Sequence, residues 1–392
     1  MEFSAFDADV FLRDYWQQKP LLLKNPWREW RNPLEPDELA GLACEEDIES
    51  RLIMHDVKRD QWKLENGPLA EQRFGKLPAQ HWTLLVQAVD QWVPEVAALL
   101  EPFRFLPNWR IDDVMVSYAA DQGGVGPHFD QYDVFLIQGL GRRRWQVGEL
   151  CGPDTELLDH QQLRLLKHFA PTQEWLLEPG DILYLPPRYA HNGIAEGENC
   201  MTYSVGLRAP SRADLVSHWC DHVLAGLSED DRFTDTVLSR SNHPGEITGS
   251  ALDTLRRMAL ERLSDESAFR RWFGGYATTR KYPELDDRPE QPITPALLRE
   301  RLDAGESLLK NPASRLAFVK AAEIAQDADV LLFADGQQFP CPLALAECLS
   351  VDAEFSAGTI GCGDAVDSVL AGLYNQGTLV FEDEAGLFED DA

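Results

Sequence analysis

His128 and Asp130 are the residues whose types and spacing most clearly suggest chemistry. They stand two positions apart in the stretch Gly123 to Trp145, which reads GGVGPHFDQYDVFLIQGLGRRRW. In an extended strand, residues i and i+2 point to the same face, so an imidazole nitrogen and a carboxylate oxygen can reach one metal ion. The glycines just before the pair allow the backbone to turn and approach closely. The spacing therefore predicts a His-x-Asp metal clip.

A third ligand is expected from residues 178–191, which read EPGDILYLPPRYAH. The Pro-Gly-Asp triplet indicates a turn, the next four residues a buried strand, and the two prolines an extended segment that delivers His191. Two histidines and one carboxylate on one side of a metal form the facial triad of non-haem Fe(II) oxygenases. The open positions can receive a bidentate 2-oxo acid and dioxygen. The sequence thus predicts a hydroxylation that converts the 2-oxo acid to succinate and carbon dioxide.

Such a cosubstrate has a distal carboxylate, which requires a cation. A planar guanidinium meets a carboxylate with two hydrogen bonds, which an ammonium does less well. Three arginines occur together, and in an extended segment Arg143 shares one face with Trp145 while Arg142 and Arg144 share the other. We expect Arg143 to point inward and hold the carboxylate, and its two neighbours to meet solvent.

The elements that must position these residues are short strands. Alternating or apolar stretches occur at 111–118, 134–137, 142–147, 182–185 and 200–206, with glycine and proline turns near them. Strands at short intervals without βαβ alternation favour a double-stranded β-helix, that is, a jelly-roll or cupin barrel. Residues 1–210 are expected to form this catalytic domain, with mixed structure at its start.

After residue 210 the sequence pattern changes from that of strands to that of helices. Apolar residues repeat at helical spacing within 215–227 and 252–263, which predicts a helical domain over 211–290. We expect this domain to be an oligomer interface, most simply that of a homodimer. Helices closed by a short β-ribbon predict a winged-helix-like domain over 291–392, after a linker rich in proline and charge. The predicted fold class is mixed α+β.

The composition restricts the class of partner. The formal charge is −30, and from residue 291 onward five Lys/Arg face 18 Asp/Glu. A polyanion would be repelled, so we expect no direct nucleic-acid binding, even by a winged-helix-like domain. The acidity either serves solubility alone or attracts a basic protein.

The remaining features indicate a cytoplasmic protein. The seven cysteines are scattered and include no C-x-x-C pair, which argues against a disulfide framework and a zinc–thiolate site. No apolar run reaches the roughly 20 residues that a membrane helix needs. The N-terminal residues lack the basic and then apolar pattern of a secretory signal.

The blocks GVGPHFDQYDVFLIQGLGRRRW and EPGDILYLPPRYAH, with the N-terminal FLRDYWQQKPLLLKN, resemble the JmjC-type 2-oxoglutarate oxygenases of the cupin-like ribosomal oxygenase family. The resemblance extends over most of the chain and is closest to the bacterial ribosomal-protein arginine hydroxylases. It implies Fe(II) at His128, Asp130 and His191, 2-oxoglutarate held by Arg143, and β-hydroxylation of an arginine in ribosomal protein L sixteen, a basic substrate.

Other pocket residues are expected beside these. Ser117 and Tyr132 are candidates for lining the cosubstrate pocket. Several acids could pair with a target guanidinium, although surface or turn roles are favoured for each of them: Asp112, Asp113, Asp121 and Asp133.

Three alternatives stay open at this point. The target could be a histidine, because related oxygenases act on either residue type. The chain could be a cupin isomerase or small-molecule oxygenase, which would turn over substrate without any protein product. It could also be a non-catalytic ribosome-associated module, for which loss of His128 would leave cellular function intact.

Overall fold

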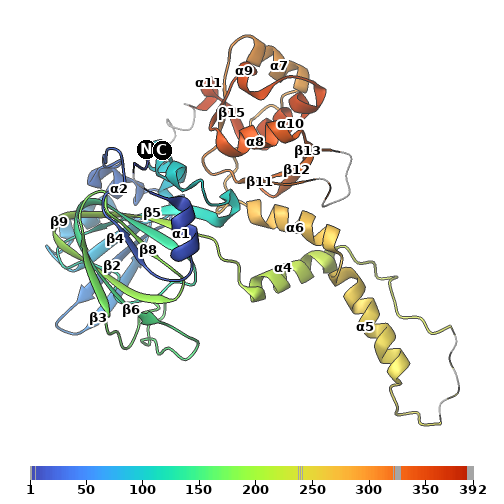
Figure 1. Ribbon diagram of the computed structural model, residues 1–392, viewed down its shortest axis with the longest axis horizontal. Coiled ribbons are helices and arrows are strands. Elements are labelled where there is room, and N and C mark those ends of the chain that lie inside the picture. Colours follow the sequence, from blue (N-terminus) through green and yellow to red (C-terminus); the bar gives the residue numbers. More distant parts are fainter. Residues whose placement is uncertain are drawn as a thin grey trace. The chain divides into compact units, whose positions relative to one another are not determined.

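The computed structural model of the chain describes residues 2–4, 6–236, 238, 240, 242–320, 322 and 328–385. The chain forms two compact units, of which the first ends at Ala209 and the second begins at Pro210 (Figure 1). The expected end of the catalytic domain lies at the same place. A further division of the second unit near residue 290 stays a prediction.

The first unit is built on one antiparallel sheet (Figure 1). In its described part the strand order is β1-β8-β6-β9-β5-β4-β2-β3, and β7 pairs with β6. The long strands β6 and β9 pair along most of their length and bend at three register shifts, which lets both of them serve two parts of the sheet. The strands are β1 (Leu21–Leu23), β2 (Ser50–Asp56), β3 (Gln61–Asn66), β4 (Trp82–Val86), β5 (Ile111–Ala119), β6 (Val134–Leu150), β7 (Gln173–Leu177), β8 (Ile182–Leu185) and β9 (Tyr189–Leu207).

Short helices precede the first strand and connect several of the later strands. The first begins after Asp7, whose side chain accepts a hydrogen bond from the Val10 backbone N–H, a common N-cap. Phe11 on this helix is buried edge-on against Tyr184, with ring centroids 4.8 Å apart. The helices of this unit are α1 (Ala8–Asp14), α2 (Pro36–Leu42), η1 (Glu71–Lys76), η2 (Val89–Gln91), α3 (Pro94–Ala97), η3 (Ala98–Phe103) and η4 (Asn108–Arg110).

Strand alternation gives the sheet two buried faces, one in the main hydrophobic core and one with a smaller apolar cluster and several polar side chains. Met201, Tyr203 and Val205 of β9 pack in the main hydrophobic core beneath the N-terminal helices. Cys200 and Thr202, which flank Met201, are equally buried but must point to the opposite side. This second face, here called the inner face, carries the polar side chains of the candidate site.

The second unit begins with three helices: α4 (Arg212–Ala225), α5 (Gly249–Leu263) and α6 (Glu266–Thr278). The first two occur where the helical spacing predicts them. The third was not predicted; it packs on strands β11 and β12 through close contacts such as Gly274 against Phe333. No residue of α5 is buried, so its apolar side chains are available to a partner.

The remainder of the second unit contains two small antiparallel sheets, β14-β10-β15 and β11-β12-β13, packed with helices. Asp335 and Gly336 both have positive φ and form the turn that joins β12 to β13. The elements are α7 (Pro295–Asp303), β10 (Leu308–Lys310), β11 (Leu316–Lys320), β12 (Val330–Ala334), β13 (Gln337–Cys341), α8 (Leu343–Val351), β14 (Glu354–Phe355), α9 (Ala357–Ile360), α10 (Asp364–Asn375), β15 (Leu379–Phe381) and α11 (Glu382–Ala385). None of the described helices is long and apolar enough to span a membrane.

Candidate metal centre

The three predicted ligands come together in the first unit. Among the described residues, His128, Asp130 and His191 are the one group of three or more His, Cys, Asp or Glu that could hold a metal ion, and their ligand atoms lie within 4.8 Å of one another. His191 belongs to β9. The other two lie in the loop before β6 rather than in a strand, as the i, i+2 reasoning had assumed.

An isolated backbone bridge replaces the expected strand. The N–H of His128 donates to the carbonyl of His191 at 2.9 Å, and the N–H of His191 donates to the carbonyl of His128 at 2.8 Å. The bridge holds the loop extended beside β9, so the two imidazole rings lie next to each other, tilted by 59°, with centroids 4.2 Å apart. The Arg188 N–H donates to the Asp130 carbonyl at 2.7 Å and fixes the third ligand's backbone.

Both histidines are held in the tautomer that a metal requires. Nδ1 of His128 lies 2.9 Å from the Gly126 carbonyl, and Nδ1 of His191 lies 2.9 Å from the Tyr189 carbonyl. A carbonyl only accepts, so each Nδ1 carries the proton and each Nε2 keeps a free lone pair for a cation. Nε2 of His191 is 3.6 Å from a carboxylate oxygen of Asp130.

The local backbone explains the glycine before the first ligand. Gly126 has φ of +85°, and a Cβ there would lie 2.9 Å from the Trp62 ring and 3.0 Å from Leu165. Only glycine therefore turns the chain here without strain or a clash. The turn delivers the carbonyl that orients His128.

Burial sets the charge state of the site. His191 is 3% exposed, and burial followed by the neighbouring His128 lowers its pKa to about 4. The imidazole is therefore neutral at pH 7 and can donate its lone pair to a metal. Two imidazole nitrogens and one carboxylate oxygen match the donor set of Fe(II) oxygenases, so the residues fit that ion.

Arg143 lies where the strand alternation places it. It is 3% exposed on the inner face of β6, its Nε donates to Cys200 Sγ at 3.4 Å, and its Nη2 has no hydrogen-bond partner among the described residues. Arg142 is exposed, and Arg144 pairs outward with Glu174 and Glu196. A buried guanidinium without a carboxylate is costly, so the site fits an anionic ligand.

The two further predicted lining residues differ in position. Ser117 is 3% exposed on the inner face of β5, and its hydroxyl donates to the Thr202 carbonyl at 3.4 Å. Tyr132 follows Asp130 in the loop and is 42% exposed. Contact of either one with a cosubstrate stays a prediction.

Two of the acids considered for substrate binding have structural partners instead. Asp133 is fully buried and accepts hydrogen bonds from Tyr184 Oη at 2.6 Å and Gln17 Nε2 at 2.9 Å, and it pairs with Arg110. Asp113 is 3% exposed and accepts from the Ala88 backbone N–H at 2.9 Å. Both carboxylates hold the fold rather than open onto a substrate.

Sequence reasoning missed three polar groups of the inner face: Thr83, Gln138 and Cys200. Strand β4, which carries Thr83, reads WTLLV and gives no alternation signal. Gln138 and Cys200 lie beside register shifts in the pairing of β6 with β9. At such a shift the alternation of residues along the sequence no longer tells which face of the sheet a side chain lies on. The cross-strand register was the signal needed, and it exists only in the folded sheet.

Comparisons with known proteins agree with this geometry. The JmjC domain family matches residues 98–215, and the ROXA-like winged helix family matches residues 261–380. The chain is 39% identical over 383 residues to the ribosomal protein uL16 3-hydroxylase of Escherichia coli (strain K12), which covers 95% of this chain and 97% of that protein.

Solved structures show the same likeness. The X-ray structure of E. coli YcfD matches with a TM-score of 0.88 at 36% identity, covering 97% of this chain and 100% of that one. The YcfD ribosomal oxygenase in complex with cobalt and 2-oxoglutarate matches with a TM-score of 0.83 at 36% identity, covering 97% and 99%. The predicted barrel and C-terminal winged helix are confirmed, and the chain belongs to the family of JmjC-domain ribosomal oxygenases.

Proposed function

We propose that this protein is an Fe(II)- and 2-oxoglutarate-dependent oxygenase that hydroxylates the β-carbon of an arginine in a large-subunit ribosomal protein. Dioxygen is consumed, and succinate and carbon dioxide are released. The observation that carries the proposal is the three-residue ligand set beside a buried guanidinium that lacks a carboxylate. Support for the substrate comes from the E. coli relative, a uL16 3-hydroxylase.

The protein's own residues divide the work. His128, Asp130 and His191 hold Fe(II), which when bound supplies the activation of dioxygen coupled to decarboxylation of the 2-oxo acid. The carbonyls of Gly126 and Tyr189 keep both imidazoles in the metal-binding tautomer. Arg143 holds the distal carboxylate by charge-assisted hydrogen bonds in a site shielded from water.

The charge of the chain suits such a substrate. Ribosomal proteins that contact RNA are rich in Lys and Arg, and a chain of formal charge −30 attracts them and raises the encounter rate. The same acidity disfavours direct binding of RNA or DNA. We place the reaction in the cytoplasm, where newly made ribosomal proteins are present.

The test is a reaction with defined components. Purified protein with Fe(II), 2-oxoglutarate and a peptide from the arginine-containing substrate should give a +16 Da product, localised to an arginine by fragmentation. Asp130→Ala serves as the matched inactive control. A product on histidine would establish the alternative target, and no product on any large-subunit protein would refute the function.

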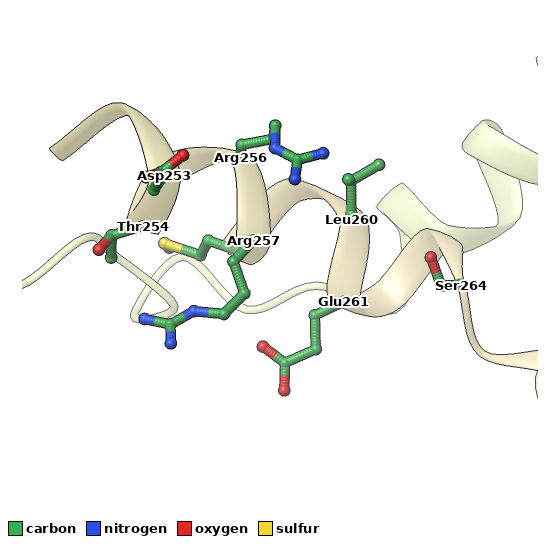
Figure 2. A pocket seen from close by; sticks show the side chains of 8 residues that line it. Asp253, Thr254, Arg256, Arg257, Leu260, Glu261 and Ser264 are labelled. Atoms are coloured by element: carbon green, nitrogen blue, oxygen red, sulfur yellow. The ribbon is translucent and has the colours of Figure 1, made fainter. Parts of the chain in front are cut away.

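We further propose that the protein is a homodimer that associates through α4 and α5. Four apolar side chains on these helices, together with Ile247 just before α5, are at least 44% exposed; the four are Val216, Leu224, Leu252 and Leu255. Figure 2 shows an open hollow along α5, where Arg256 and Arg257 lie between Asp253 and Glu261. A second copy of the chain, related by a two-fold axis, would cover these exposed apolar side chains with the same surface.

Leu255→Glu should therefore give a monomer. The measurement is mass by light scattering after size exclusion, with the conservative change Thr254→Ser at a half-buried neighbouring position as control. A Leu255→Glu variant that is still a dimer would mean that the interface does not include α5. A monomeric wild-type protein would refute the proposed homodimer.

A further inference from the structure

Unpaired donors gather on the inner face of the first unit. Among the described residues, the buried side-chain polar atoms without a hydrogen-bond partner are Thr83 Oγ1, Arg143 Nη2, Trp145 Nε1 and Arg280 Nε. The first three belong to the sheet that carries the metal ligands. A buried donor left unpaired loses its hydration without compensation, so three in one sheet indicate a ligand that supplies acceptors.

The cross-strand register places Thr83 near Arg143. Thr83 of β4 pairs with Ala119 of β5, and Ala119 pairs with Cys200 of β9. Residues directly opposite each other in an antiparallel pair point to the same face. Cys200 Sγ in turn accepts from Arg143 Nε at 3.4 Å. Thr83 therefore belongs to the row of the inner face that continues through Ala119 to Cys200, and the guanidinium of Arg143 contacts the end of that row.

The neighbouring row shows a contrast. Ser117 donates to the Thr202 carbonyl at 3.4 Å, the Thr202 hydroxyl donates to Gln138 Oε1 at 3.3 Å, and Gln138 Nε2 donates to the Leu140 carbonyl at 2.7 Å. These groups satisfy one another within the protein. Thr83 is fully buried and has no such partner among the described residues. Of the hydroxyls of Ser117, Thr202 and Thr83, only that of Thr83 needs a ligand as its hydrogen-bond partner among the described residues.

We propose that the Thr83 hydroxyl donates a hydrogen bond to the distal carboxylate of the 2-oxo acid, beside the guanidinium of Arg143. The inference rests on the proposed function. A carboxylate has two oxygens and needs several donors, and both groups are buried donors of the inner face that lack an acceptor among the described residues. Thr83 is thus a cosubstrate-positioning residue that requires the far end of the ligand to be an acceptor.

The test measures binding rather than turnover. The full-length protein is loaded with Co(II), which does not turn over, and 2-oxoglutarate is titrated calorimetrically. Thr83→Val, which keeps the shape and removes the hydroxyl, should raise the dissociation constant at least tenfold, or about 1.4 kcal/mol. Thr83→Ser should restore binding to within about threefold of wild type, since it keeps the donor. Co(II) affinity should be unchanged in both variants.

Thermal stability gives a second measurement, in which Thr83→Val should stabilise the ligand-free protein although it weakens 2-oxoglutarate binding. Without ligand, Thr83→Val should raise the melting temperature, because it removes an unpaired buried hydroxyl. The matched control is Ser50→Ala on β2, whose buried hydroxyl donates to the Ala43 carbonyl at 3.1 Å. That variant should lower the melting temperature and leave 2-oxoglutarate binding unchanged.

The outcomes separate the inference from the function on which it rests. A wild-type protein that does not bind 2-oxoglutarate would refute both. A wild type that binds it, with Thr83→Val binding equally well, would refute only the role of Thr83. A lower melting temperature for ligand-free Thr83→Val would also contradict the inference, because the hydroxyl would then have a partner in the protein.

Discussion

Replacing Arg143 by alanine tests the cosubstrate site most sharply. The guanidinium is 3% exposed, and its Nη2 has no described protein partner, so the 2-oxo acid is the group that completes it. A buried hydrogen bond to a charged group contributes about 1.5–3 kcal/mol. At about 1.4 kcal/mol for each factor of ten, Arg143→Ala should raise the Michaelis constant for 2-oxoglutarate by roughly 10- to 150-fold.

The assay follows succinate release against 2-oxoglutarate concentration at saturating peptide substrate. Arg142→Ala is the matched control, because that neighbouring arginine is exposed and points to the opposite face. Arg143→Lys should fall between wild type and Arg143→Ala, since it keeps the charge and loses the planar fork. A Michaelis constant for Arg143→Ala within threefold of the control would mean that another residue anchors the cosubstrate.

Three further predictions concern the metal ligands and the frame around them. Asp130→Ala should abolish iron binding and turnover while keeping the fold, as seen by metal content and circular dichroism; retained iron would exclude Asp130 as a ligand. In the metal-free protein the lowered pKa of His191 means that the unfolded chain binds an extra proton between about pH 6.5 and 4, so the free energy of unfolding should fall by roughly 3 kcal/mol as the pH drops through that window. The free energy of unfolding, measured by urea titration at several pH values, should change with pH more steeply in wild type than in His191→Asn within that window. An identical pH dependence of the two proteins would contradict the lowered pKa of His191. Asp133→Ala removes the hydrogen-bond acceptor of Tyr184 and the ion-pair partner of Arg110, so the free energy of unfolding measured by urea titration should fall by about 3 kcal/mol. A fall of less than about 1 kcal/mol would mean that Asp133 contributes little to the stability of the fold.

The residues that could be predicted are those whose chemistry is local. The His-x-Asp pair and the arginine run depend on spacings of two residues, which an extended backbone translates directly into direction. Arg143 accordingly lies on the inner face, and its neighbour Arg144 pairs outward. The winged-helix-like character of the C-terminal part could also be predicted, because the apolar periodicity of helices such as α7 and α10 is a local signal.

What the sequence could not show depends on contacts between distant segments. The backbone bridge that joins His128 to His191 spans 63 positions and leaves no pattern in either segment. The alignment of Thr83 with Cys200 requires the register of two strand pairs. A surface or turn role was favoured for Asp133 over a role in the pocket, yet the residue is fully buried by partners from distant segments, Gln17 and Tyr184.

The central claim is most directly tested by mass spectrometry of intact ribosomal proteins from cells with and without this protein. We predict that one basic large-subunit protein is heavier by 16 Da only when the protein is present, that the added oxygen lies on an arginine β-carbon, and that Asp130→Ala fails to restore it. Identical masses for all ribosomal proteins in the two cell types would contradict the claim.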